Sequence, residues 1–89
     1  MPANGKFAEV NPNPFTGKLL VNIASAFRDK ATLIITDLSG RQLFKQNKVL
    51  SAGNNEIQID EAGKFSRGTY LLTIIESQRV QSIKVIKGN

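Results

Sequence analysis

The sequence predicts an all-β protein, a two-sheet antiparallel sandwich of seven strands. Short stretches rich in Ile, Val, Leu and Thr alternate with polar residues at period two. Clusters of Gly, Asn, Ser and Asp separate them at intervals of about ten residues. Sustained apolar spacing at three and four residues is missing, so crossover helices are not expected. A five-strand barrel is the alternative fold, but the strands are too many and too evenly spaced for it.

The first predicted strand is short, residues 7–10. It stops at the segment 11–14, Asn-Pro-Asn-Pro, because two prolines remove backbone donors and push their predecessors into extended or turn geometry. The second strand covers residues 18–27, and its odd positions are expected to face the core: Leu19, Val21, Ile23 and Phe27.

The third strand, residues 31–38, is partly apolar on both faces, which indicates a strand deep in its sheet. A tight hairpin is expected at residues 37–41, since Gly40 can adopt a positive φ and Asp37 or Ser39 can bond locally to the turn backbone. The next strand, residues 42–46, is then its antiparallel neighbour.

Residues 53–55, Gly-Asn-Asn, are expected to form a turn before a strand at 56–60. The segment 62–68 is expected to be a loop with one helical turn, in which Phe65 closes the end of the core.

The most apolar strand is predicted at residues 69–76, with Tyr70, Leu72 and Ile74 on one side. A tyrosine at the start of a sandwich strand commonly buries its ring and ties its hydroxyl to a nearby loop. A two-residue turn, Ser77-Gln78, then leads to a last strand at residues 79–87. This number and spacing of strands is typical of immunoglobulin-like or fibronectin type III-like sandwiches.

Composition argues against most enzyme classes. The chain has no cysteine, histidine or tryptophan, so thiol nucleophiles, the usual zinc ligands and the commonest proton shuttle are missing. The only paired carboxylates, Asp60 and Glu61, are adjacent at a strand end and read as a solvated turn. Six serines have no histidine to activate them. We therefore expect no catalytic residues, no metal and no cofactor.

Twelve basic and seven acidic residues leave a net charge of +5. The basic residues are scattered among the acidic ones, which favours a mixed, solubilising surface over a nucleic-acid site. A sandwich can nevertheless gather distant lysines on one face. No apolar window approaches the length of a membrane span, so direct membrane insertion is not expected.

Five landmarks follow one another along the chain in a fixed order. They are Asn11-Pro12-Asn13-Pro14-Phe15, Asp37-Leu38-Ser39-Gly40-Arg41, Gly53-Asn54-Asn55, Gly68-Thr69-Tyr70-Leu71-Leu72 and Ile83-Lys84-Val85-Ile86-Lys87. In this order and spacing the chain, from about residue 10 to 89, resembles the type A C-terminal sorting domain of the type IX (Por) secretion system. The family usually has an aromatic residue where this chain has Asn11.

The resemblance implies a seven-stranded immunoglobulin-like domain that directs an attached cargo protein out of the cell. The cargo would reach the periplasm, be recognised by the outer-membrane translocon and its shuttle proteins, and arrive at the cell surface or in the medium. A sortase-like peptidase would then remove the domain by a cut at or before residues 7–10. On this view residues 1–9 are the junction with the cargo and residues 10–89 the sorting domain.

The resemblance also assigns residues to roles. The motif residues carried over as structural are Pro12, Asn13, Pro14, Gly40, Gly68 and Tyr70. The residues expected to contact the translocon or its partners are Arg41, Lys84, Val85, Ile86 and Lys87.

A terminal strand at a sheet edge has unpaired backbone groups, which suits capture by strand addition. Lys84 and Lys87 are three apart and should project to opposite faces, which favours a graspable tail. Removal of residues 85–89 is then expected to abolish export at modest cost in stability. The alternative function is a carbohydrate- or protein-binding adhesive module, because one fold serves many functions.

Overall fold

The computed structural model describes residues 7–88 and contains seven strands and one 3₁₀ turn in that range. In chain order the elements are β1 (Ala8–Asn11), β2 (Leu19–Ser25), β3 (Asp29–Asp37), β4 (Gln42–Leu50), β5 (Gly53–Ile59), η1 (Glu61–Lys64), β6 (Gly68–Ile75) and β7 (Val80–Lys87).

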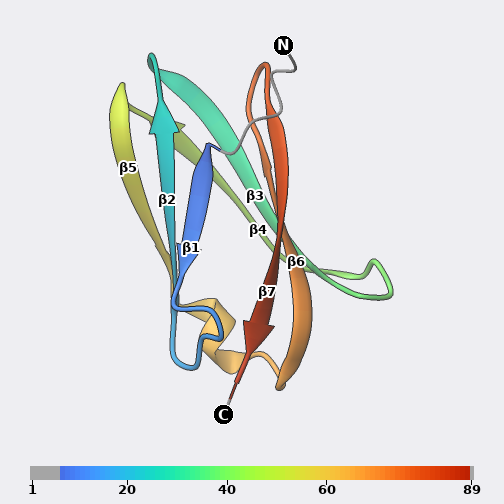
Figure 1. The fold of residues 1–89 in the computed structure, drawn as a ribbon. Helices are drawn as coiled ribbons and strands as arrows, with labels where there is room; N and C mark the ends of the chain where they lie inside the picture. Colours follow the sequence, from blue (N-terminus) through green and yellow to red (C-terminus); the bar gives the residue numbers. More distant parts are fainter. Residues whose placement is uncertain (1–6, 89) are drawn as a thin grey trace.

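The strands form two antiparallel sheets packed face to face, as Figure 1 shows. One sheet has the order β1-β2-β5 and the other the order β4-β3-β6-β7. The chain crosses between sheets after β2, after β4 and after β5, while β3–β4 and β6–β7 are hairpins within one sheet. The all-β, immunoglobulin-like sandwich is therefore confirmed, and the barrel alternative is wrong.

The core lies between the two sheets, and alternation builds it in β2, β3 and β6, whereas the consecutive residues Leu43 and Phe44 of β4 both pack on it beside a register shift. In β2 the odd positions are buried, and in β6 Tyr70, Leu72 and Ile74 are buried while Leu71 and Ile75 are exposed. The predicted central position of β3 is confirmed, because β4 and β6 pair with its two edges. Each fully buried Leu or Ile contributes about 1.5–3 kcal/mol of transfer free energy.

Every strand differs from its predicted range at one end or at both, and β3 already begins at Asp29 instead of residue 31 because Asp29 and Lys30 pair with β4. The second strand ends at Ser25, whose hydroxyl donates to the carbonyl of Phe27 at 2.6 Å, so Phe27 lies in a turn and is 57% exposed instead of facing the core. β4 is longer than predicted and runs to Leu50. Residues 53–55 belong to β5 instead of forming a turn, because the chain turns at residues 51–52, where the Asn55 side chain bonds both backbone groups of Ser51.

Both predicted hairpin turns are present. Asp37 organises the first: its Oδ1 accepts from the backbone N–H groups of Ser39 and Arg41 and from the Ser39 hydroxyl. Gly40 has φ of 92°, a conformation that L side chains rarely adopt. At the second turn, the N–H of Glu76 donates to the carbonyl of Arg79 at 2.8 Å and closes a two-residue loop.

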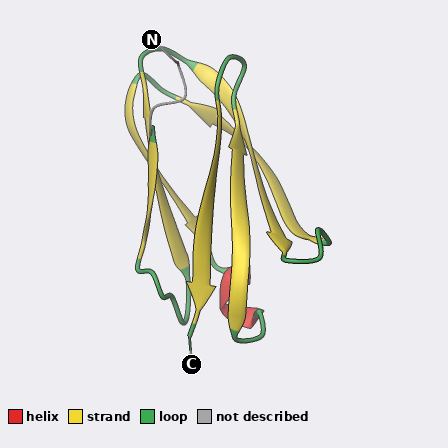
Figure 2. Ribbon diagram, turned by 45° about the vertical axis from the view of Figure 1, so that its right-hand side comes forward, coloured by secondary structure: helices red, strands yellow, loops and turns green. Residues whose placement is uncertain are grey.

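The predicted helical turn is η1, at the lower end of the sandwich in Figure 2. Its Gly63 packs so closely on the β1–β2 connection that an added Cβ would lie 1.9 Å from the carbonyl oxygen of Gly17. Phe65 is half-buried and stacks on Tyr70 with ring centroids 5.1 Å apart, so it closes the core as expected. The Tyr70 hydroxyl donates to the carbonyl of Ser66, the tyrosine corner typical of immunoglobulin-like sandwiches.

Candidate functional site, the seam between the first and last strands

β7 is an edge strand, and its free edge faces the free edge of β1 (Figure 1). We call this line of contact the seam. The backbone N–H and carbonyl of Ile86 bond to Asn13 and Phe15, on the side of β7 away from β6. In an antiparallel pair, successive residues direct their backbone groups to alternate sides of the strand. The even-numbered residues of β7 therefore direct their backbone groups toward the seam. On β1, Ala8 and Val10 direct their backbone groups toward the seam.

The lower seam is closed by residues 12–16, which we call the strap. The Asn13 side chain donates through Nδ2 to the carbonyl of Lys84 at 3.1 Å, and its Oδ1 accepts from the N–H of Ile86 at 2.9 Å. The backbone of Phe15 then pairs with Ile86 and Gly88, both at 2.8 Å. The expected unpaired edge is therefore wrong for the end of β7, because the strap occupies its backbone groups.

The strap is held by one apolar anchor. Phe15 is completely buried, whereas Pro12 and Pro14 on either side of Asn13 are exposed. The prolines contribute no backbone donors, so the Asn13 side chain makes the hydrogen bonds that a backbone strand would otherwise make. Asn13 thus contacts β7 through its side chain, a contact that the sequence does not show.

The upper seam is closed by Gln81, which sequence reasoning missed. Its Oε1 accepts from the N–H of Phe7 at 2.8 Å and of Ala8 at 3.0 Å, and its Nε2 donates to the carbonyl of Ala8 at 3.0 Å. The one signal for it in the sequence was a glutamine in the inward-facing row with Ile83 and Val85.

Between these two closures the seam opens into a groove of about 590 Å³. Val10 lines it from β1, and Ser82 and Lys84 line it from β7. Since Val10 and Ser82 direct backbone groups into the groove, this is the part of the seam where an added strand could pair, while the Lys84 carbonyl already accepts from Asn13.

The four predicted contact residues of β7 divide between two faces. Lys84 and Ile86 are exposed, whereas Val85 is fully buried in the core and Lys87 is 8% exposed, with its Nζ donating to the carbonyl of Gly88 at 3.1 Å. The expectation that the two lysines project to opposite faces is confirmed. The expectation that residues 85–89 can be removed with a modest loss of stability is wrong for Val85. Its side chain is fully buried, so its removal leaves a cavity in the core.

Arg41, the fifth predicted contact residue, lies far from the four on β7. It follows the β3–β4 hairpin, and β4 is the edge of the sheet opposite to β7. Its Nε is 3.2 Å from Oδ2 of Asp37. The structure therefore does not bring Arg41 together with the lysines of the last strand. Gly68 and Tyr70 lie at the start of β6, where Gly68 pairs with Lys87 and Tyr70 with Val85.

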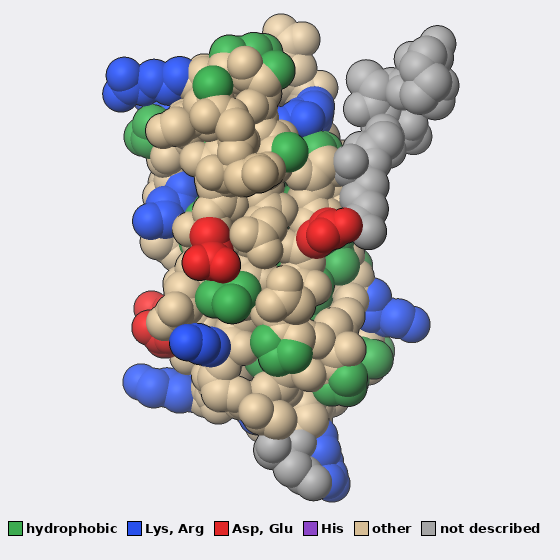
Figure 3. All heavy atoms as spheres, turned by 60° about the vertical axis from the view of Figure 1, so that its left-hand side comes forward, with side chains coloured by type: hydrophobic (Ala, Val, Ile, Leu, Met, Phe, Trp, Pro, Cys, Tyr) green, Lys and Arg blue, Asp and Glu red, His purple; other side chains and the backbone are tan. Residues whose placement is uncertain are grey.

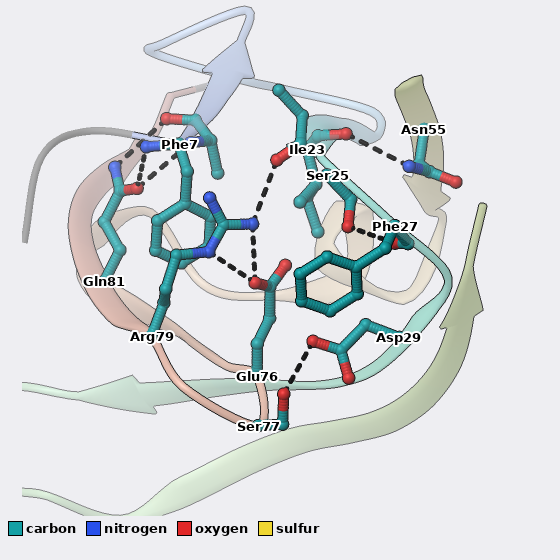
Figure 4. A network of polar contacts seen from close by, with 12 residues as sticks. Phe7, Ile23, Ser25, Phe27, Asp29, Asn55, Glu76, Ser77, Arg79 and Gln81 are labelled. Atoms are coloured by element: carbon teal, nitrogen blue, oxygen red, sulfur yellow. Dashed lines mark hydrogen bonds and ion pairs between the residues drawn. The ribbon is translucent and has the colours of Figure 1, made fainter. Parts of the chain in front are cut away.

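A polar cluster lies around the β6–β7 turn, as Figure 4 shows. Glu76, with a side chain 1% exposed, forms an ion pair with Arg79 at 2.6 Å. The Arg79 guanidinium lies 4.0 Å from the centre of the Phe7 ring and donates to the carbonyl of Ala24 at 3.0 Å. This one arginine thus links the β6–β7 turn to the starts of both β1 and the β2–β3 turn.

The two carboxylates with clearly shifted pKa values both stabilise turns. The backbone N–H of Lys30 and the hydroxyl of Ser77 donate to Asp29 and lower the pKa of its carboxyl. The hydroxyl of Ser39 and the N–H of Arg41 lower the pKa of Asp37 in the same way. Neither group lies in the seam, so these shifts point to turn formation and not to acid–base chemistry.

Comparison with known proteins identifies the family. A family model described as a secretion system C-terminal sorting domain, of the type IX (Por) system, matches residues 9–88. This chain belongs to that family. A search of curated proteins finds no match. The matched range of this sorting domain contains the strap, the whole of β7 and the groove residues Val10, Ser82 and Lys84.

Residues 7–88 of the sorting domain contain no cluster of three or more Asp, Glu, His or Cys side chains placed to hold a metal ion. Within the same range, no helix has the length and apolar character needed to cross a membrane.

Proposed function

We propose that this domain is the export signal of an attached cargo protein, read by the type IX translocon in the periplasm and then removed. Its role is non-catalytic, and the cargo ends at the cell surface or in the medium. The family match over residues 9–88 is the observation that carries the proposal. The seam supports it, because it offers a strand edge that is partly covered and partly open.

We propose that recognition uses the intact fold first. Of the four residues of the last strand predicted to contact a partner, Lys84 and Ile86 are exposed, so a partner can contact these two while the strap is in place. Val85 and Lys87 become accessible only when β7 separates from the core. Arg41, on the far edge of the sheet, would belong to a separate contact.

The proposed removal by a sortase-like peptidase has a structural boundary. Phe7 and Ala8 are buried, and both are tied to Gln81. Since a peptidase needs an accessible extended segment, we place the cut before Phe7, in residues 1–6, which lie outside the described residues. The predicted division into 1–9 and 10–89 therefore stays a proposal, with β1 packed as part of the sandwich.

The experiment is a fusion of residues 1–89 behind a periplasmic reporter, expressed in a host with type IX machinery and in a matched strain that lacks the translocon. The reporter should reach the surface or medium only in the first strain. Mass spectrometry of the exported reporter should show a new C-terminus before Phe7. Retention in the periplasm of both strains would refute the export function, and an exported reporter that keeps the domain would refute only its removal.

The adhesive alternative gains no support from the described surface. Sugar-binding faces usually present aromatic rings, which offer a flat apolar surface beside polar groups. Among residues 7–88 the aromatic side chain that is largely exposed is Phe27, and it lies in a turn and not on a sheet face.

A further inference from the structure

The outer face of the four-stranded sheet consists of the side chains that point away from the other sheet. It borders the seam groove along β7, where Ser82 and Lys84 belong to both. The strand register defines it: it holds the even-numbered residues of β3 and β7 and the odd-numbered residues of β6. On β4, Lys45 and Val49 belong to it, because they pair with Ile34 and Lys30.

The centre of this face is apolar. Leu71 and Ile75 on β6 are 37% and 38% exposed, and Val80, which pairs with Ile75, is 57% exposed. Ile34 on β3 pairs with Thr73, the residue between Leu71 and Ile75, so it lies beside both. The apolar residues therefore form a strip across three strands, in which Thr73 lies between Leu71 and Ile75.

Three lysines surround this strip. Lys84 on β7 pairs with Leu71, Lys45 on β4 pairs with Ile34, and Lys30 lies at the far end of β3. Lysines separated by up to 54 positions in the sequence (84 − 30) thus share one face. Scattered charge in the sequence had indicated a mixed surface, but the register collects these three cations around one apolar strip.

Two acidic residues border this face, because Asp29 and Glu76 line a hollow together with Lys30 and Ile75. Both carboxylates have partners within the domain, Asp29 in Ser77 and Glu76 in Arg79. Asp37 occupies an inward register position opposite Tyr70. On the outer side of the three-stranded sheet, Glu9 and Glu56 lie in one row on either side of Asn22. Figure 3, turned so that this side comes forward, shows acidic side chains near its middle. The two outer faces therefore differ in the sign of their charge.

The charge and shape of the face restrict its occupant. A second copy of the domain would bring three further lysines against these three, which like-charge repulsion disfavours. A bilayer surface would favour Trp or Tyr at the level of the headgroups, but the strip consists of Ile, Leu and Val side chains on a flat sheet. Four strands about 4.8 Å apart and about 26 Å long present roughly 500 Å². Stable complexes bury about 800 Å² per partner, so this face suits a transient contact.

We propose that this outer face docks a protein of the export apparatus whose surface has an acidic rim around an apolar centre. The inference rests on the proposed export function and adds a second recognition surface to the seam. Complementary charges would speed the encounter and fix its orientation, and the small contact area would allow release once the cargo has been passed on.

The test compares two reporter fusions of residues 1–89 in the host with type IX machinery. One carries Lys30→Glu and Lys45→Glu on the face, and it leaves Lys84 unchanged because Lys84 also lines the seam groove. The matched control carries Lys18→Glu and Lys64→Glu, two exposed lysines outside the face, and lowers the net charge by the same amount. We expect surface reporter to fall about tenfold for the face variant and less than about twofold for the control. Equal export by both variants would refute the docking face.

Two further measurements distinguish protein docking from a loss of folding and from lipid binding. Thermal melting of the purified variants checks folding, and a second face variant, Leu71→Thr with Ile75→Thr, tests the strip without any change of charge. If this variant folds and exports at the wild-type level, the apolar centre has no role and the proposal fails. Co-sedimentation with phosphatidylglycerol vesicles, if lost in the lysine variant, would assign the face to a bilayer and overturn the protein occupant. A wild-type fusion that is not exported refutes the export function itself.

Discussion

Replacement of Asn13 by alanine tests the strap, because it removes both hydrogen bonds from the side chain to β7. Each such bond contributes about 0.5–1.5 kcal/mol net, and both are exposed, so we expect a total loss of about 1–2 kcal/mol. In a domain of this size 1 kcal/mol shifts Tm by about 4–8 °C. The melting temperature should therefore fall by roughly 4–16 °C, while the control Asn54→Ala, at an exposed position of β5, should change it little.

Hydrogen exchange measured by NMR gives a sharper readout. The N–H of Ile86 loses its acceptor in Asn13→Ala, whereas the N–H of Ile83 still pairs with Leu72 on β6. A loss of 1.4 kcal/mol corresponds to about a tenfold change, so exchange at Ile86 should accelerate about tenfold more than at Ile83. Uniform acceleration at both amides, or none at Ile86, would show that Asn13 does not hold the edge of β7.

The remaining predictions concern single contacts. Tyr70→Phe leaves the Ser66 carbonyl without its donor and should cost about 1–2 kcal/mol in urea unfolding, whereas an unchanged midpoint would mean that the corner does not stabilise the fold. Gly63→Ala places a Cβ 1.9 Å from the Gly17 oxygen and should cost about 1–3 kcal/mol or prevent folding; a variant as stable as wild type would contradict the close packing. Because the pKa of Asp37 is lowered in the folded state, its stabilisation is complete above its unfolded pKa of about 4 and is lost as pH falls through the folded value. Unfolding free energy measured from pH 6 to pH 2 should therefore fall less steeply in Asp37→Asn than in wild type, and identical slopes would contradict this.

The alternation of β2, β3 and β6 could be predicted from the sequence because burial in a sandwich follows period two directly. Strand limits were less predictable. Phe27 has the parity of a core residue but lies beyond the turn that Ser25 begins, and Gly53 pairs with Ser25 although its residue type favours turns. Local propensity gives way at these positions to pairing with a distant strand.

The seam could not be predicted, because its contacts join the two ends of the chain. Asn13 bonds Ile86 across 73 positions, and Gln81 bonds Phe7 across 74. Sequence patterns report neighbours within one strand or turn, so they placed Lys84 and Lys87 on opposite faces correctly but gave no partner for the edge of β7. The division of charge between the two outer faces escaped prediction for the same reason, since it depends on strand order.

The surface-exposed fraction of a reporter fused to residues 1–89 tests the central claim most directly. It is measured by protease accessibility in intact cells that carry the type IX machinery, beside the same reporter without the domain. A folded export signal predicts that the reporter becomes accessible only when the domain is attached. Equal protection of both reporters inside the periplasm would contradict the account.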